Sequence, residues 1–283
     1  MFRKQLLEIV RPEASEPAGL AFISGVERDG MVMRGRARSN SGHNYEIKNG
    51  YLDLLEGKRG ASNVANLTNF APGAGRLYEP VWRTRSLSLL TGSSFPNERE
   101  VELVAELVEL DRAGTYLDLG CSAGLYTRHM EILLDEMAAD AYIIGIDIAP
   151  VMLQEAVKRS LEAEAMPSFA RADAHELPFA SRSFAGVVCG GTLNELGDPA
   201  TALRECARVL IPGGRMAIMG IMRPSKNRGT LAQRFLATGG VRFFTREELE
   251  DLLYNTGFEI ESLRTYGPVF FAATQRRYDT PYN

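Results

Sequence analysis

Three aspartates and two glycines stand at spacings that suit a cofactor containing a ribose. Asp118 lies near the end of an apolar run, and the turn that follows it contains Gly120 and Gly124. Asp147 closes a second apolar run, and Asp173 follows a third. A carboxylate can accept hydrogen bonds from both ribose hydroxyls, and glycine lets the backbone approach a ligand closely. These residues therefore predict a nucleoside-type cofactor site.

Alternating strands and helices must bring these residues together. Parallel strands are predicted at 115–120, 142–148, 167–174, 183–191 and 214–222, with helices at 125–138, 150–164 and 199–210 between them. A helix at 245–258 and a closing hairpin, 259–266 with 269–275, follow. The fold class is therefore α/β: a Rossmann-like, seven-stranded mixed sheet whose last strand is antiparallel, plus a small N-terminal β-rich region.

A dinucleotide is the first cofactor to consider at the glycine turn. Its fingerprint is G-x-G-x-x-G, in which the glycines let the backbone approach a pyrophosphate. Aligned from Gly120, the second and third positions are Ser122 and Leu125. Two of the three glycines are missing, which argues against a nicotinamide or flavin dinucleotide.

Four motifs occur in order, namely LDLGCSAG at 117–124, IGIDIAPVML at 144–153, DAHELPF at 173–179 and RVLIPGG at 208–214. Over about residues 97–276 the chain resembles the class I S-adenosylmethionine-dependent methyltransferases, with Ser122 at the middle glycine of their first motif. The resemblance implies S-adenosylmethionine as cofactor, S-adenosylhomocysteine as its product, and no metal.

The resemblance also assigns parts of the cofactor to residues. Asp147 would bind the ribose, and Asp118 would face the ammonium or else act as a helix N-terminal acid. Asp173 would meet the adenine edge, and Met152 or Ile148 would sandwich the ring, with a core methionine as the alternative. The residues expected to contact the cofactor are Asp118, Gly120, Cys121, Gly124, Asp147, Ile148, Met152, Asp173, Ala174, Cys189 and Gly190.

Methyl transfer from a sulfonium depends on in-line geometry and a dry site more than on a dedicated base. Four side chains are nevertheless candidates for a catalytic role: Asn194, Glu195, Tyr126 and His129. The segment 223–244 is basic and is expected to form a lid, with a solvated loop as the alternative. The acceptor is expected to contact Tyr126, Asn194, Arg223 and Arg234.

The region before residue 97 divides into two parts. Residues 1–60 are expected to form the β-rich region, 61–96 a linker with a helical cap, and 97–283 the methyltransferase domain. SGHNYEIKNGYLDLL, at 41–55, resembles the end of a zinc ribbon that precedes several methyltransferase domains. Ser41 stands where the ribbon has a cysteine, so this ribbon is expected to be metal-free.

The residues of these motifs are similar to those of the ubiquinone/menaquinone C-methyltransferase group. This similarity implies O- or C-methylation of a small lipophilic or aromatic acceptor, natural-product or quinone-like. A 23S ribosomal RNA guanine N-methyltransferase and a non-catalytic cofactor-binding protein are the alternatives. A net charge of −4 and a pI near 5.6 argue against a nucleic-acid partner. Three scattered cysteines and the lack of a long apolar run favour a cytoplasmic monomer or homodimer without membrane insertion.

Overall fold

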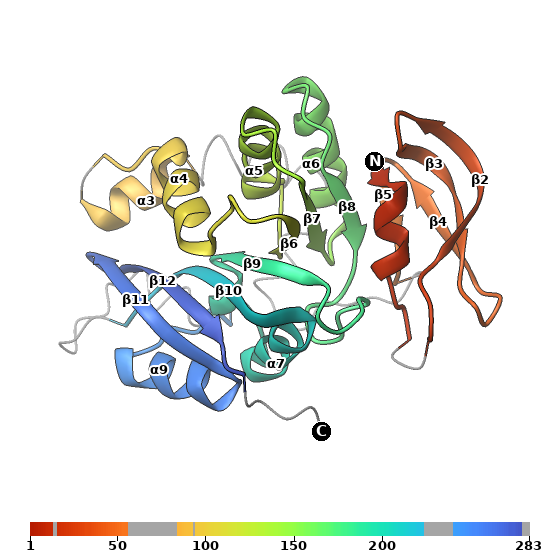
Figure 1. Ribbon diagram of the computed structural model, residues 1–283. Coiled ribbons are helices and arrows are strands. Elements are labelled where there is room, and N and C mark those ends of the chain that lie inside the picture. Colours follow the sequence, from red (N-terminus) through yellow and green to blue (C-terminus); the bar gives the residue numbers. More distant parts are fainter. Residues whose placement is uncertain (14–15, 56–83, 93, 224–239, 279–283) are drawn as a thin grey trace.

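In the computed structural model, one twelve-stranded sheet extends through the described residues, which are 1–13, 16–55, 84–92, 94–223 and 240–278 (Figure 1). Its strands follow the order β1-β3-β4-β5-β8-β7-β6-β9-β10-β12-β11, with β2 paired to β3.

The seven C-terminal strands form the predicted methyltransferase-type sheet. They are β6 (Gly114–Leu119), β7 (Ala141–Asp147), β8 (Ser168–Arg171), β9 (Phe184–Gly190), β10 (Leu210–Ile221), β11 (Phe258–Tyr266) and β12 (Val269–Arg276). Strand β12 is antiparallel to both β10 and β11, while β6 to β10 are parallel. The chain leaves β6 towards β7 on one side and returns to β9 on the other, so a topological switch point lies between β6 and β9.

Helices cover both faces of this sheet (Figure 1). They are α3 (Thr84–Thr91), α4 (Asn97–Val108), α5 (Leu125–Glu136) and α6 (Pro150–Glu162) on one face, and α7 (Pro199–Val209) and α9 (Arg246–Asn255) on the other. Alternate residues of each strand enter opposite cores: Leu117 packs in one buried cluster and Tyr116 in the other. No helix in the described part of the chain is both long and apolar enough to cross a membrane.

The N-terminal strands extend the same sheet. They are β1 (Phe2–Arg3), β2 (Ala21–Arg28), β3 (Met31–Arg38), β4 (Asn44–Lys48) and β5 (Tyr51–Asp53), with the short helix η1 (Lys4–Ile9) after β1. Strand β5 pairs in parallel with β8, where Leu52 lies opposite Ala170. The α/β class is confirmed, but the sheet has more strands than the seven predicted, because β5 covers the open edge that β8 would otherwise present. The domain boundaries stay a prediction.

The buried carboxylate of Glu16 binds the turn at residues 39–41, where the segment that resembles a zinc ribbon begins. Glu16 accepts hydrogen bonds from the backbone N–H groups of Asn40 and Ser41, at 3.1 and 3.4 Å. The hydroxyls of Ser39 and Ser41 lie 2.7 Å apart. Within the described ranges there is no group of three or more His, Cys, Asp or Glu side chains placed to hold a metal ion. The resemblance of this region to a ribbon stays a prediction.

Candidate cofactor site

The turn between β6 and α5 has the backbone of a glycine loop at three positions. Gly120, Ser122 and Gly124 have φ angles of 70°, 50° and 76°, all in the left-handed region. For a residue with a Cβ this conformation costs roughly 1–2 kcal/mol. Ser122 thus adopts the conformation of the glycine that it replaces, and its hydroxyl donates a hydrogen bond to the sulfur of Met152 at 3.6 Å.

Neighbouring elements leave no room for side chains at either glycine. A Cβ on Gly120 would lie 2.4 Å from Oγ1 of Thr192, and a Cβ on Gly124 would lie 2.9 Å from the Cβ of Ala156. Thr192 begins the short helix η3 (Thr192–Asn194) that follows β9, and its hydroxyl donates to the carbonyl of Gly120 at 3.2 Å. The loops after β6 and β9 therefore touch at the switch point.

Asp147, at the end of β7, joins this loop to helix α6. One oxygen of its carboxylate accepts the N–H of Ser122 at 2.9 Å, and the other accepts the N–H of Ala149 at 2.8 Å. Burial raises the pKa of Asp147 above its ordinary value, although the backbone donors act in the opposite direction. Each oxygen keeps a second lone pair, so this carboxylate can also accept ribose hydroxyls. This half-buried acid beside two glycines fits the cofactor that the motifs imply.

Asp118 is buried beneath the loop. One oxygen of its carboxylate accepts both the backbone N–H and the hydroxyl of Thr127, at 3.1 and 2.6 Å. Thr127 lies in the first turn of α5, where a negative charge is stabilised by the N–H groups and the helix dipole. This contact is the one expected of a helix N-terminal acid. The contact of Asp118 with a cofactor ammonium stays a prediction.

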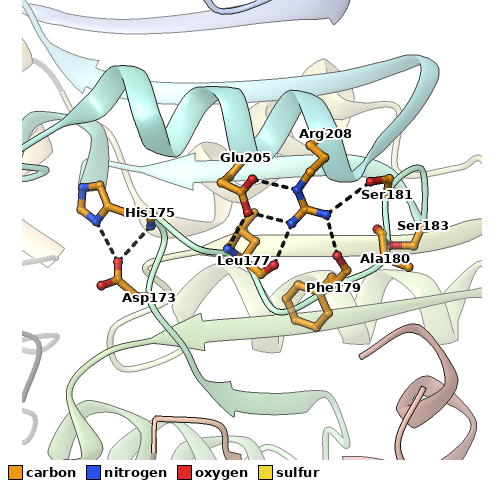
Figure 2. A network of polar contacts seen from close by, with 9 residues as sticks. All are labelled: Asp173, His175, Leu177, Phe179, Ala180, Ser181, Ser183, Glu205 and Arg208. Atoms are coloured by element: carbon orange, nitrogen blue, oxygen red, sulfur yellow. Dashed lines mark hydrogen bonds and ion pairs between the residues drawn. The ribbon is translucent and has the colours of Figure 1, made fainter. Parts of the chain in front are cut away.

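Asp173 is held by its neighbour His175, as Figure 2 shows. One carboxylate oxygen accepts the backbone N–H of His175 at 2.9 Å and lies 2.7 Å from Nδ1 of the same residue. Because the carboxylate is the acceptor, this ring nitrogen carries the proton. The imidazole therefore fixes the direction in which the Asp173 carboxylate points.

Two residues of α7 hold the loop that follows Asp173 (Figure 2). Arg208 donates to the carbonyls of Leu177 and Phe179, each at 2.7 Å, and forms an ion pair with Glu205 at 2.7 Å. Glu205 in turn accepts the N–H of Leu177 at 2.8 Å. The motifs DAHELPF and RVLIPGG, about 30 residues apart in sequence, thus form one hydrogen-bonded unit. This role of Arg208 was not among the sequence predictions, although its place in RVLIPGG is a signal for it.

The remaining predicted cofactor contacts surround the same turn. Met152 is buried where it accepts the Ser122 hydroxyl, and the carbonyl of Ile148 accepts from Arg171 at 3.1 Å. Cys121 and Cys189 are buried, and burial raises the pKa of the Cys189 thiol to about 12. A thiol with that pKa stays neutral, as expected for a small core residue. Ala174 and Gly190 are half-buried.

Asn194 is almost fully buried, and its amide is used by the backbone. Its Nδ2 donates to the carbonyls of Ile221 and Arg242, at 2.9 and 2.6 Å, while its Oδ1 accepts the N–H of Ile221 at 2.9 Å. The side chain thereby ties the end of β10 to the residues just before α9. These contacts favour a structural role for Asn194 over that of a base.

The other candidate catalytic and acceptor residues are scattered. The hydroxyl of Tyr126 donates to the buried carboxylate of Glu100 on α4, and Nδ1 of His129 lies 2.8 Å from the carbonyl of Leu125. Glu195 is half-buried just after η3. Arg223 donates to the carbonyl of Phe243 at 3.1 Å. Arg234 and residues 224–239 of the expected lid lie outside the described residues.

Comparison with known proteins agrees with this geometry. The family described as "Methyltransferase domain" matches residues 117–218. The demethylmenaquinone methyltransferase of Thermotoga maritima is 29% identical over 198 residues, which cover 62% of this chain and 80% of that protein. The 2-phytyl-1,4-naphtoquinone methyltransferase of Thermosynechococcus vestitus is 33% identical over 123 residues, 44% of this chain and 53% of that protein. The chain thus spans about half the length of the second relative.

A solved structure shares the fold. The SAM-dependent methyltransferase from Aquifex aeolicus superposes with a TM-score of 0.53 at 18% identity, over 62% of this chain and 89% of that one. At this identity the likeness concerns the architecture.

Proposed function

We propose that the chain is a class I S-adenosylmethionine-dependent methyltransferase and that it methylates a small lipophilic acceptor, a quinone-like or aromatic molecule. The observation that carries the proposal is the convergence of three chain segments at the switch point. The glycine loop after β6, Asp147 after β7 and Thr192 after β9 are joined by direct hydrogen bonds.

Each part of this site has a distinct task in the proposal. Asp147 accepts the ribose hydroxyls, and the Gly120 turn admits the methionine portion of the cofactor to the backbone. Asp173, aimed by His175, accepts from the adenine amine. When bound, S-adenosylmethionine supplies an electrophilic methyl group on a sulfonium. The chain contributes orientation and exclusion of water, which is what this transfer needs most.

The acceptor class follows from the relatives and from the charge of the chain. Both quoted relatives are named for quinone substrates. A net charge of −4 disfavours ribosomal RNA, because RNA binding depends on neutralising phosphates. We place the reaction in the cytoplasm, with oxygen or activated carbon as the methylated atom.

Labelled cofactor tests this proposal. The full chain is incubated with methyl-labelled S-adenosylmethionine and a panel of demethylated quinols and phenols, and label is counted in an organic extract. Asp147→Ala should abolish the label, while Asp140→Ala, at the opposite end of β7 and exposed, should leave it unchanged. Label found in undermodified ribosomal RNA instead would overturn the acceptor class. Failure of the wild-type chain to bind cofactor would overturn the enzymatic assignment.

A further inference from the structure

The N-terminal strands present an ordered polar face to solvent. In antiparallel pairs, residues that lie directly opposite share a face. The register places Val26 beside Arg34, Ser24 beside Arg36, and Ala21 beside Arg38, and it places Glu46 and Asn44 next to Arg36 and Arg38 on the other side. We call this set, together with Lys48 two residues beyond Glu46, the outer face: Ala21, Ser24, Val26, Arg34, Arg36, Arg38, Asn44, Glu46 and Lys48.

The opposite side of these strands belongs to the core. Ala37 and Ile47 are fully or almost fully buried there, and Leu6 and Leu7 of η1 pack in the same cluster. All residues of the outer face, in contrast, are exposed. Figure 1 places β2, β3 and β4 at the end of the sheet remote from β11 and β12. Among the described residues, the outer face is therefore an exposed surface at one end of the sheet.

Positive charge dominates the outer face. Arg34, Arg36 and Arg38 repeat on alternate positions of β3, and Lys48 adds a fourth cation. Glu46 carries the opposing charge; the Lys48 ammonium, 3.0 Å away, and then the guanidinium groups of Arg36 and Arg34 lower its pKa. The whole chain has a net charge of −4, so this basic face gives an acidic protein a preferred orientation towards an anionic surface.

Aliphatic side chains adjoin these cations. Val26, opposite Arg34, is 62% exposed, and Ile23, at a bulge of the same strand, is 47% exposed. Among the strands of the described residues, β2 pairs with β3 alone, so it lies at an edge of this sheet. A single-stranded RNA site would be expected to offer aromatic rings for base stacking, whereas the outer face offers arginine and valine. Basic and aliphatic groups together suit the interface of an anionic bilayer.

We propose that the outer face docks the protein on anionic lipid bilayers, where a lipophilic acceptor resides. The statement that docking brings the enzyme to its acceptor rests on the proposed function. The binding of the outer face to anionic lipid does not depend on it. Arginine guanidinium groups would lie among lipid phosphates, and Val26 and Ile23 would reach the level of the headgroups. Docking of this kind is reversible and salt-sensitive, since it relies on charges that a Debye length of about 8 Å screens at physiological ionic strength.

Vesicle co-sedimentation tests the docking. The full chain is mixed with vesicles of phosphatidylcholine alone or with vesicles that also contain phosphatidylglycerol, whose negative surface potential attracts basic residues, at low and at high salt. Binding is expected to the anionic vesicles only and to disappear at high salt. Arg34→Gln/Arg36→Gln should weaken it about 30-fold, because each cation near such a surface contributes about 1 kcal/mol. Arg204→Gln/Arg246→Gln, which removes two exposed arginines from α7 and α9, should bind like the wild type.

Three results would overturn the docking: equal binding to both vesicle types, no effect of the outer-face variant, or preferential binding to RNA. Methyl transfer to an acceptor dispersed in detergent separates this inference from the proposed function. Transfer in detergent without vesicle binding refutes the docking and leaves the function intact. Vesicle binding by a chain that transfers no methyl group refutes the function and leaves the docking intact. The outer-face variant should transfer methyl groups in detergent at the wild-type rate.

Discussion

The loops after β6, β7 and β9 and the outer face of β2–β4 use polar residues in opposite ways. At the loops, carboxylates and amides are buried or half-buried and are bound to particular backbone groups, as Asp147 is to Ser122. On the outer face, cations are exposed and repeat along a strand. In the loops, the geometry of the site depends on each residue individually. On the outer face, binding to an anionic surface depends on the total charge. Matched substitutions in the two regions should therefore differ sharply in effect.

The largest difference is expected between two glycines with the same backbone conformation. Gly120 and Gly30 have φ angles of 70° and 76°, but a Cβ meets Thr192 at Gly120 and open space at Gly30. Gly120→Val should reduce S-adenosylmethionine affinity more than about 100-fold by displacing the β9 loop, whereas Gly30→Val should bind normally. Calorimetry measures both, with circular dichroism as the control for folding. Normal binding by the Gly120 variant would disprove our interpretation of the loop.

Two asparagines should differ in their contribution to stability. Asn194→Ala removes the three hydrogen bonds that this buried amide makes with the backbone of Ile221 and Arg242, a loss of about 3 kcal/mol in the free energy of unfolding. Asn44→Ala removes one exposed contact, between Arg38 and the asparagine side chain, and should cost less than about 0.5 kcal/mol. Urea denaturation gives both values. A cost below about 1 kcal/mol for Asn194→Ala would refute the structural role.

Substitution of His175 and of His43 should have different effects on cofactor affinity. His175→Ala frees the carboxylate of Asp173 and should raise the cofactor Kd about tenfold, the equivalent of one hydrogen bond. His175→Asn retains an N–H donor near Nδ1 and should restore much of the affinity. His43→Ala, in the exposed turn before β4, should have no effect on the Kd. If alanine and asparagine at position 175 gave the same Kd, His175 would not be a positioning residue.

The smallest effect is expected at two left-handed positions that are not glycine. Ser122 and Asp29 have φ angles of 50° and 51°. Glycine at either position relieves about 1 kcal/mol of backbone strain. Ser122→Gly should gain less stability than Asp29→Gly, because it also loses the contact with Met152, and it should keep its cofactor affinity. Thermal denaturation and calorimetry check this pair. Loss of cofactor binding in Ser122→Gly would show that the hydroxyl itself is required.

Sequence patterns predicted those parts of the site that depend on local structure. Buried parallel strands appear as apolar runs, so the positions of Asp118 and Asp147 at strand ends could be predicted, as could the turn at Gly120. The pairing of Leu52 with Ala170 could not, because contacts across more than a hundred residues leave no periodic signal. The contacts of Asn194 could not be predicted from the sequence either, because its partners are backbone groups, which every residue has.

Cofactor affinity measured as a function of pH on wild-type protein and on Asp147 variants tests the central claim most directly. Burial raises the pKa of Asp147, so on acidification this group takes up a proton earlier than an ordinary aspartate and loses its capacity as a double acceptor. Wild-type affinity for S-adenosylmethionine should therefore fall as the pH decreases. Asp147→Asn should bind at least about 100-fold more weakly and without this pH dependence. Wild-type affinity in the Asp147→Asn variant, at every pH, would contradict the account.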